Sequence, residues 1–345
     1  MLEELNVPCP APGFGGDAPL MSLELDCCVI PLRHNMKLIQ TTDFFYPLVD
    51  DPYTMGWITC CNVLSDLYAM GVIHCDNMLL LLGVAQEMEP KEREVAMKLL
   101  MRGFKDCAMK AGTFIRGGQT VLSPWLMVGG VATSVCNDNE YLMPNRAVVG
   151  DKLILTKPLG TQVAVNARQW MIDEHVNWKT RLMNVISTSE LSSLFDAATL
   201  SMTHLNKTAA MLMHKYSAHA CTDVTGFGLM GHAENLVKFQ TDPAIGFKIN
   251  RLPYLAGCME LSMALNDRFK LRNGLSPETS GGLLIALPAE KAEDFCRELC
   301  DLDGCPAWII GDVVEAESRT AFLVEDPEFI RVDHASIKAP DITTH

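Results

Sequence analysis

The sequence lacks several patterns that mark whole classes of protein, and each absence narrows its possible functions. It has no run of about 18 apolar residues, the length that a membrane-spanning helix needs. No basic stretch followed by an apolar segment opens the chain, so we expect no secretory signal peptide and a soluble, cytoplasmic protein. The sequence also contains no CxxC pair, no GxxxxGK[ST] loop and no GxSxG motif. These absences argue against a zinc ribbon, a Walker-type nucleotide site and a serine nucleophile on a strand–helix turn.

Positive charge is also scarce. The chain has 28 Lys and Arg against 42 Asp and Glu, a net charge of −14. This balance argues against nucleic acid or an anionic membrane as a partner, because both bind basic surfaces. It does not argue against nucleotides, since Mg²⁺ bridges acidic side chains and phosphates. Hydrophobic residues make up 48% of the 345 residues, which predicts a globular protein of about two domains.

The 13 cysteines are not arranged as a disulfide framework. Cys27–Cys28 and Cys60–Cys61 are adjacent pairs, which rarely reach disulfide geometry. Most others lie in apolar segments, as reduced thiols in a protein core would. Cys296, Cys300 and Cys305 form the one cluster, but its spacing and the lack of a nearby histidine make a structural zinc site the weaker interpretation.

The first half of the chain alternates strand and helix patterns. Four prolines and three glycines predict an irregular arm at residues 1–22. A domain is expected at 23–150, with strands at 23–32, 36–45, 77–85, 113–118 and 125–136 and helices at 51–70 and 91–112. Asp51 and Pro52 supply an N-cap and a first-turn proline for the first helix. The apolar run 77–85 predicts a strand buried on both faces.

A turn-rich stretch near residue 150 is the expected boundary, with a second domain at 151–345. Ser187 and Glu190 match a capping box, which predicts a long helix reaching about Tyr216. Further helices are expected at 231–239 and 289–295, and strands at 152–160, 244–250, 281–288 and 307–314. Both halves are therefore predicted to be α/β, each with its own sheet.

Four aspartates are the main candidates for chemistry. Asp43 ends a strand pattern, Asp26 interrupts one, and Asp223 lies in a small-residue loop before a helix. Asp66 follows Asn62 in an apolar helix at a spacing that places both on one face. Each could instead cap a helix or pair with an Arg or Lys side chain, because a buried carboxylate is costly without a partner. Clustered aspartates without His or Cys favour a hard cation such as Mg²⁺.

Glycine-rich segments offer candidate phosphate loops. Arg116–Thr120 follows a strand, and its two glycines would let backbone N–H groups approach an anion, although a plain turn would look the same. Gly281–Gly282 is a weaker candidate. Gly226–Gly231 matches GxGxxG, but the preceding SAHACTDVT is not the apolar strand of a dinucleotide fold, and the expected downstream acidic residue is absent.

In this order, the motifs TTDFFYPLVDDPYTMG, NVLSDLYAMG, GGQTVLSPW, LTKPLGTQ, TDVTGFGLMGHA and ETSGGLL resemble those of the selenophosphate synthetases, closest to the eukaryotic branch. That family belongs to the ATP-dependent enzymes built like aminoimidazole ribonucleotide synthetase. The resemblance implies an α/β (α+β) fold of two domains and a homodimer in which the N-terminal sheets complete a barrel. It implies synthesis of selenophosphate, AMP and phosphate from ATP, selenide and water.

The resemblance also assigns roles to individual residues. It implies metal coordination by Asp26, Asp66 and Asp223, with Mg²⁺ as the metal. It implies ATP contacts from Asp43, Asp66, Gly117, Gly118, Gln119 and Thr120. It implies protein partners that deliver selenium or synthesise selenocysteine.

One family feature is missing from the sequence. The family carries an N-terminal loop with Cys or selenocysteine followed by Lys, whereas here no Lys precedes Lys37 and Cys9 lies in the wrong context. We therefore assign no catalytic residue and expect little or no selenophosphate from this polypeptide alone, as in an N-terminally truncated form. The alternatives are a non-catalytic regulatory relative and another ATP-using enzyme of this fold, such as a thiamine-phosphate kinase.

Overall fold

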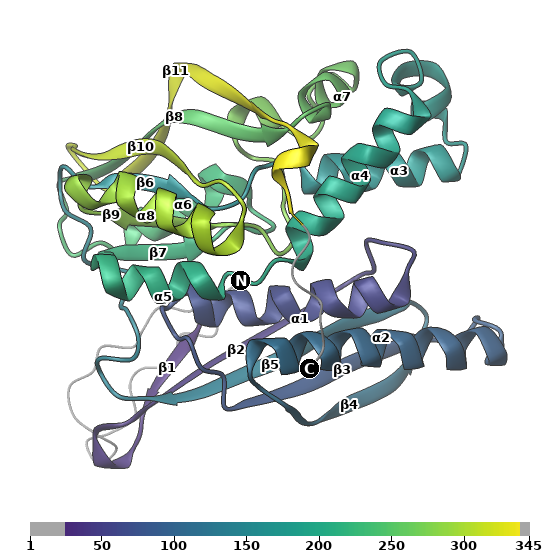
Figure 1. Cartoon of the computed structure of the whole chain (residues 1–345), viewed down its shortest axis with the longest axis horizontal. Coiled ribbons are helices and arrows are strands. Elements are labelled where there is room, and N and C mark those ends of the chain that lie inside the picture. Colours follow the sequence, from purple (N-terminus) through teal and green to yellow (C-terminus); the bar gives the residue numbers. More distant parts are fainter. Residues whose placement is uncertain (1–24, 339–345) are drawn as a thin grey trace.

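The computed structural model describes residues 25–338, so the expected irregular arm at 1–22 lies outside the described part. Two mixed sheets organise the chain, with strand orders β1-β2-β5-β3-β4 and β11-β8-β10-β6-β9-β7 (Figure 1). The strands are β1 Cys28–Pro31, β2 Lys37–Phe45, β3 Asn77–Ala85, β4 Ile115–Ser123, β5 Met127–Cys136, β6 Lys152–Leu155, β7 Ala220–Asp223, β8 Ile245–Leu255, β9 Leu283–Leu287, β10 Trp308–Glu315 and β11 Thr320–Val332. The α-helices are α1 Pro52–Ala69, α2 Pro90–Ala111, α3 Thr161–Ile172, α4 Thr188–Thr203, α5 Lys207–Tyr216, α6 Gly228–Lys238, α7 Cys258–Ala264 and α8 Ala289–Asp303. The two-domain α/β prediction is confirmed.

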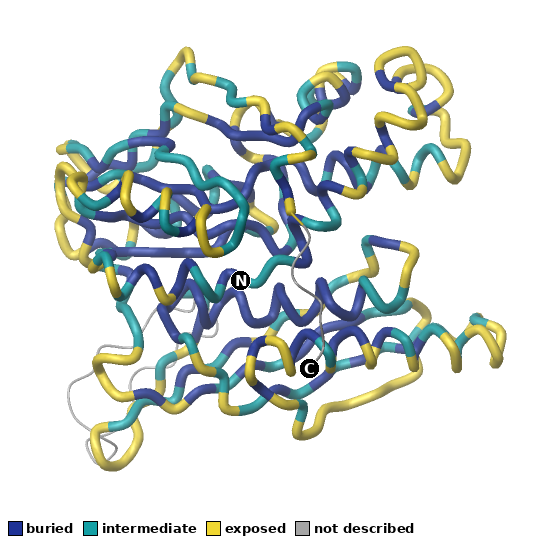
Figure 2. Tube along the Cα trace, viewed as in Figure 1, coloured by how far each residue is buried: buried dark blue, intermediate teal, exposed yellow. Residues whose placement is uncertain are grey.

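Helix α1 begins and ends where its sequence predicts. The Asp51 side chain accepts a hydrogen bond from the Thr54 backbone N–H at 2.8 Å, and Pro52 occupies the first turn. Gly71 follows the helix with φ +70°, a conformation that glycine adopts without strain. Every residue from Met55 to Ala69 is buried, because α1 packs on β2 and β5 on one side and on α4, α5 and β7 on the other (Figure 2).

Helices α1 and α2 pack at unusually short range. A Cβ atom on Gly56 would lie 2.0 Å from the Leu100 carbonyl oxygen, and one on Gly103 would lie 1.9 Å from the Tyr53 carbonyl oxygen. Only glycine at both positions permits this contact between the two helix backbones.

The second sheet is covered on both faces. Leu153 and Leu155 of β6 join the apolar core that includes α3, α4 and α6, whereas Ile154 joins the core beneath α5 and α8. Alternate residues of a strand point to opposite faces, so two separate layers of helices cover this sheet.

The first sheet differs from the prediction in β3, the strand next to the edge strand β4. Burial alternates along β3, so this strand is half-buried on one face rather than fully buried on both as its apolar run predicts. Its neighbour β4 is exposed along almost its whole length (Figure 2).

One further prediction from the second half is wrong, and one strand there was not predicted. The long helix expected from Ser187 to Tyr216 is broken at His204–Asn206 into α4 and α5, although the Ser187–Glu190 capping box is present. The segment SAHACTDVT, which we did not expect to be an apolar strand, contains β7, and all four of its residues are buried. The hydrophobic periodicity of the sequence predicts neither the break nor the strand. The two helices pack against α1, and β7 pairs with β9, so both features depend on contacts with distant segments.

Candidate functional site

Three of the predicted aspartates meet in space. Asp26 lies just before β1 rather than within a strand, Asp66 lies in α1, and Asp223 ends β7. One carboxylate oxygen from each lies within 4.8 Å of the others. Among residues 25–338, this is the one group of three or more His, Cys, Asp or Glu residues with such spacing. We refer to Asp26, Asp66 and Asp223 as the aspartate cluster.

Hydrogen bonds orient two of these carboxylates and leave the third free. Thr222 Oγ1 donates to Asp26 Oδ1 at 2.9 Å, and Thr41 Oγ1 donates to Asp66 Oδ2. Asp223 is only 1% exposed, yet its Oδ2 atom has no hydrogen-bond partner among the described residues. A buried carboxylate oxygen without a partner is costly, so this atom fits a ligand to a cation.

Electrostatics also favour a cation at the aspartate cluster. Burial raises the pKa of Asp26 well above its ordinary value, and the neighbouring Asp223 raises it further. The pKa of Asp66 is raised for the same reasons in the same order. Carboxylates held this close either bind protons tightly or share a bound cation that neutralises their charge. Oxygen ligands without His or Cys are the set that Mg²⁺ prefers.

Asp43 lies beside the aspartate cluster, in β2 rather than at its end. It lines the same cavity of about 760 Å³ as Asp26 and Asp66. Asn62 Nδ2 donates to Asp43 Oδ2 at 2.8 Å, and Asn62 Oδ1 accepts from the Ser280 backbone N–H at 2.7 Å. Burial, with a contribution from Asp223, raises the pKa of Asp43 to about 6. Asn62 of α1 thus joins Asp43 of the first sheet to the ETSGG segment of the second domain.

The segment Gly117–Thr120 is not a loop. It lies inside β4, paired in parallel with Leu79–Leu82 of β3, and is exposed. Two strands, β5 and β3, separate β4 from β2 in the sheet. Neighbouring strands lie about 4.8 Å apart, so roughly 14 Å separates Gly117–Thr120 from Asp43 within one chain. The loop prediction is wrong, since the glycines fit a strand edge.

Sequence reasoning overlooked several residues near the aspartate cluster. His232 of α6 lines the cavity, and its Nε2 atom accepts from the Thr225 backbone N–H at 3.1 Å, while burial lowers its pKa. Glu278 accepts from the backbone N–H groups of Gly160 and Thr161, both at 2.8 Å, and burial raises its pKa to about 7. Two signals in the sequence were available. Thr41 and Asp43 are two residues apart, which places both on one face of a strand, and Glu278 is the acidic residue of ETSGG.

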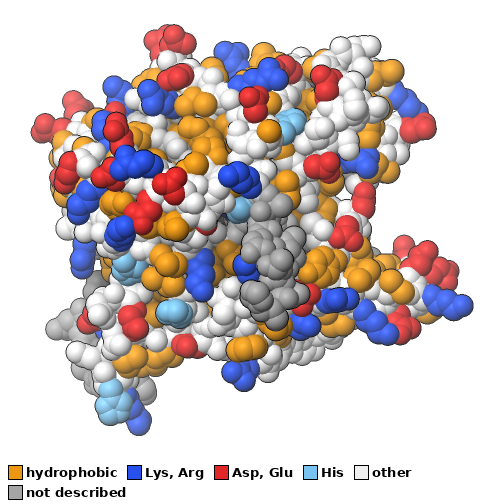
Figure 3. All heavy atoms as spheres, viewed as in Figure 1, with side chains coloured by type: hydrophobic (Ala, Val, Ile, Leu, Met, Phe, Trp, Pro, Cys, Tyr) orange, Lys and Arg blue, Asp and Glu red, His pale blue; other side chains and the backbone are white. Residues whose placement is uncertain are grey.

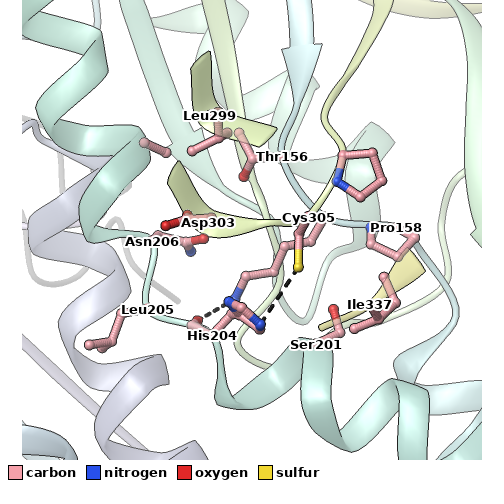
Figure 4. A pocket seen from close by; sticks show the side chains of 13 residues that line it. Thr156, Pro158, Ser201, His204, Leu205, Asn206, Leu299, Asp303, Cys305 and Ile337 are labelled. Atoms are coloured by element: carbon pink, nitrogen blue, oxygen red, sulfur yellow. Dashed lines mark hydrogen bonds between the residues drawn. The ribbon is translucent and has the colours of Figure 1, made fainter. Parts of the chain in front are cut away.

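A second, smaller pocket lies at the break between α4 and α5 (Figure 4). Lys157 lines it and donates to the carbonyl oxygens of His204 at 2.7 Å and Ser280 at 2.8 Å. Burial lowers the pKa of this lysine to about 8. Cys305 Sγ lies 3.6 Å from His204 Nε2, whereas Cys296 and Cys300 remain on α8. Within residues 25–338, these three cysteines are not among the groups whose possible ligand atoms all lie within 4.8 Å of one another.

Comparisons with known families match both halves of the chain. Residues 24–136 match the family described as AIR synthase related protein, N-terminal domain. Residues 148–324 match AIR synthase related protein, C-terminal domain. These matches confirm the predicted fold class.

Solved structures share this fold at low sequence identity. A thiamine-monophosphate kinase from Stenotrophomonas maltophilia K279a is 19% identical with a TM-score of 0.63, covering 86% of this chain and 88% of that one. E. coli HypE is 17% identical with a TM-score of 0.62, covering 83% of this chain and 81% of that one. These likenesses concern the fold alone.

Curated relatives are much more similar in sequence. Selenide, water dikinase 2 of Mus musculus is 51% identical over 96% of this chain and 74% of the mouse protein. Selenide, water dikinase 2 of Homo sapiens is 51% identical over 98% of this chain and 76% of the human protein. Selenide, water dikinase of Dictyostelium discoideum is 48% identical over 89% and 86%. With the aspartate cluster in place between the two sheets, the chain belongs to the selenide, water dikinase family.

Proposed function

We propose that this protein makes selenophosphate from ATP, selenide and water, with AMP and phosphate as the other products. The observation that carries this proposal is the aspartate cluster, with its unpartnered buried oxygen on Asp223. The names of relatives at about half identity supply the substrates.

We propose that Asp26, Asp66 and Asp223 hold Mg²⁺ and that ATP binds in the adjoining cavity. Bound Mg²⁺ supplies the positive charge that offsets the phosphates of ATP in an acidic site. The chain's own residues orient the ligands: Thr41 fixes Asp66, and Thr222 fixes Asp26. This preorganisation is the main contribution expected of a protein in phosphoryl transfer.

The orientation of Asp43 follows from Asn62. Its amide holds Asp43 Oδ2 while its carbonyl oxygen binds the Ser280 backbone. This arrangement keeps a carboxylate that would contact ATP at a fixed distance from the ETSGG segment, so both sheets contribute to one site.

A homodimer is part of the proposal. Gly117–Thr120 lie three strands from Asp43 in one chain, so their proposed contact with ATP is easiest to explain if β4 of a second copy completes the site. The exposed edge of β4 carries Val121 and Leu122, and Trp125 follows it at 63% exposure. Apolar side chains on an unpaired strand edge are typical of a surface that pairs with another chain.

This dimer can be tested with one charge. Leu122→Asp should convert the protein to a monomer in sedimentation velocity and weaken ATP binding. Leu302→Asp, an equally exposed leucine on α8, is the matched control. A wild-type monomer, or a Leu122→Asp dimer, would contradict the proposed interface.

The reaction is tested by its nucleotide product. Selenide-dependent AMP formation identifies a dikinase, whereas an ordinary kinase of this fold releases ADP. ADP as the sole product would refute the proposal.

Cellular context completes the proposal. No helix within residues 25–338 is long and apolar enough to cross a bilayer. Acidic and basic side chains are interspersed over the C-terminal half on the face shown in Figure 3. We propose a cytoplasmic enzyme that receives selenium from a delivery protein and supplies selenocysteine synthesis, with no nucleic acid or membrane partner. We also propose that the two domains divide near residue 150.

A further inference from the structure

A third cavity, of about 560 Å³, shares the lining residue Leu275 with the aspartate-cluster cavity. One wall is a single face of α3, formed by Gln162, Asn166 and Trp170, which are spaced four residues apart. The rest of the lining comes from the segment 268–277, which follows α7 and begins with the basic sequence RFKLR. Figure 1 shows α3 and α7 on the same side of the C-terminal domain, and these two helices are in contact.

Arg268 is held in place by an aromatic ring. Its guanidinium carbon lies 5.6 Å from the centre of the Trp170 ring, and Phe269 packs against the same ring at 6.0 Å. Such stacking fixes the plane of a guanidinium group and leaves its N–H groups free for other partners. A guanidinium held this way is suited to bidentate binding of a phosphate or carboxylate group.

The positive charges here lack acidic partners. Among the described residues, no carboxylate lies within 4.0 Å of the side-chain nitrogens of Arg268, Lys270 or Arg272, whereas other cations of the chain do form such pairs. Arg268 and Lys270 both line the cavity. In a chain with a net charge of −14, two unpaired cations around one cavity produce a local potential that attracts anions.

The loop that carries these cations is ordered by its own hydrogen bonds. The Asp267 N–H donates to the Ser262 carbonyl oxygen at 2.8 Å, the Lys270 N–H to the Asp267 carbonyl oxygen at 2.8 Å, and the Leu275 N–H to the Lys270 carbonyl oxygen at 3.1 Å. Asp267 and Lys270 have φ values of +50° and +53°, uncommon for residues other than glycine. The side chains therefore start from a fixed backbone, which lowers the entropy lost on binding a ligand.

This loop is also attached to the aspartate-cluster cavity. Leu275 lines both cavities. The Met230 N–H of α6 donates to the Gly274 carbonyl oxygen at 2.9 Å, and the Glu278 N–H donates to the Thr225 carbonyl oxygen at 3.0 Å. An anion bound at Arg268 would thus lie next to the segment that leads from Asp223 into α6.

We propose that Arg268 and Lys270, with Gln162, form a binding site for a phosphate-type oxyanion, separate from the aspartate cluster. The guanidinium fork and the ammonium group match the charge and geometry of a tetrahedral phosphate, and Gln162 supplies a neutral N–H donor. Two sources share this chemistry: free orthophosphate and the phosphate of AMP. The source of the anion in the neighbouring cavity rests on the proposed function. The binding of an anion by Arg268 and Lys270 does not.

The test is calorimetric titration of the full chain with orthophosphate, and separately with AMP, in EDTA. Without divalent cations the aspartate cluster repels phosphates, so saturable binding reports the proposed site. Arg268→Gln should weaken it about tenfold or more, since it removes charge-assisted hydrogen bonds. Arg297→Gln, on α8, removes the same charge elsewhere and should leave binding unchanged.

Each outcome decides the proposal. Saturable binding that Arg268→Gln weakens and Arg297→Gln does not supports it, and the tighter of the two ligands identifies the source. No saturable binding to the wild-type protein, equal weakening by both variants, or no effect of Arg268→Gln overturns it. If Arg268→Gln fails to fold, Lys270→Gln replaces it under the same criteria. Asp66→Asn should still bind phosphate in EDTA, which separates failure of this site from failure of the proposed function.

Discussion

Replacing one carboxylate of the aspartate cluster should stabilise the metal-free protein while abolishing its response to Mg²⁺. Asp66→Asn keeps the size of the side chain and an oxygen that can accept from Thr41. It removes the charge from a buried group whose pKa is raised first by burial and then by Asp223. The substitution therefore relieves repulsion that a bound cation would otherwise offset.

The size of the effect follows from the spacing of the cluster. Two unit charges 4.8 Å apart repel by about 3.5 kcal/mol at an effective dielectric constant of about 20. Charge screening and proton binding within the cluster reduce the realised gain to about 1–3 kcal/mol. For a chain of 345 residues, with an unfolding entropy of about 2.1 cal/mol/K per residue, that gain corresponds to a rise in Tm of roughly 1–4 °C in EDTA.

The assay is thermal unfolding in EDTA and across a Mg²⁺ series. The wild-type protein should gain about 2.7 kcal/mol when Mg²⁺ reaches about a hundred times its Kd, and Asp66→Asn should gain nothing. Asp301→Asn, an exposed aspartate on α8, should behave as wild type in both conditions. A lower Tm for Asp66→Asn in EDTA, or a preserved response to Mg²⁺, would refute the reasoning.

Three further substitutions test other parts of the structure. Gly103→Ala should destabilise the protein in urea by about 3 kcal/mol or more, because its Cβ would lie 1.9 Å from a carbonyl oxygen of α1, while Gly226→Ala, with open space around it, should cost far less. Lys157→Met should remove a pH dependence of stability. The pKa of Lys157 is about 8 in the folded state, below the ordinary 10.5, so between pH 8 and 10.5 only the unfolded chain retains the proton. The stability of the wild-type protein relative to the variant should therefore rise over this pH range. Asn62→Ala should lower stability by about 2 kcal/mol, measured in urea, since the Ser280 N–H loses its acceptor, and an unchanged midpoint would count against that contact.

Local signals were sufficient to predict the start of several helices and the three residues of the aspartate cluster. The Asp51–Pro52 start of α1 and the Ser187–Glu190 capping box are short-range features, and the structure contains both. Asp26, Asp66 and Asp223 were predicted because a carboxylate in an apolar or small-residue segment needs an explanation, and they do converge.

The remaining features depend on contacts between distant segments. The glycines of Gly117–Thr120 read as a loop, but their conformation is set by pairing with β3, which local sequence does not reveal. Likewise the break at His204–Asn206 lies where Lys157, far away in sequence, donates to the His204 carbonyl oxygen at 2.7 Å. Asp26 lies outside β1 because it faces Thr222 of the other domain.

The burial of α1 on two sides has a consequence for how the molecule comes apart. This helix completes the core of the first sheet and also covers α4, α5 and β7 of the second domain (Figure 1). Separating the domains would expose buried apolar side chains of the helix and break the polar contacts that Asn62 and Asp66 make with the second domain. We therefore expect the described part of the chain to unfold in a single calorimetric transition, and either half expressed alone to aggregate. The unit of cooperative folding is thus the pair of domains, although each has a sheet of its own.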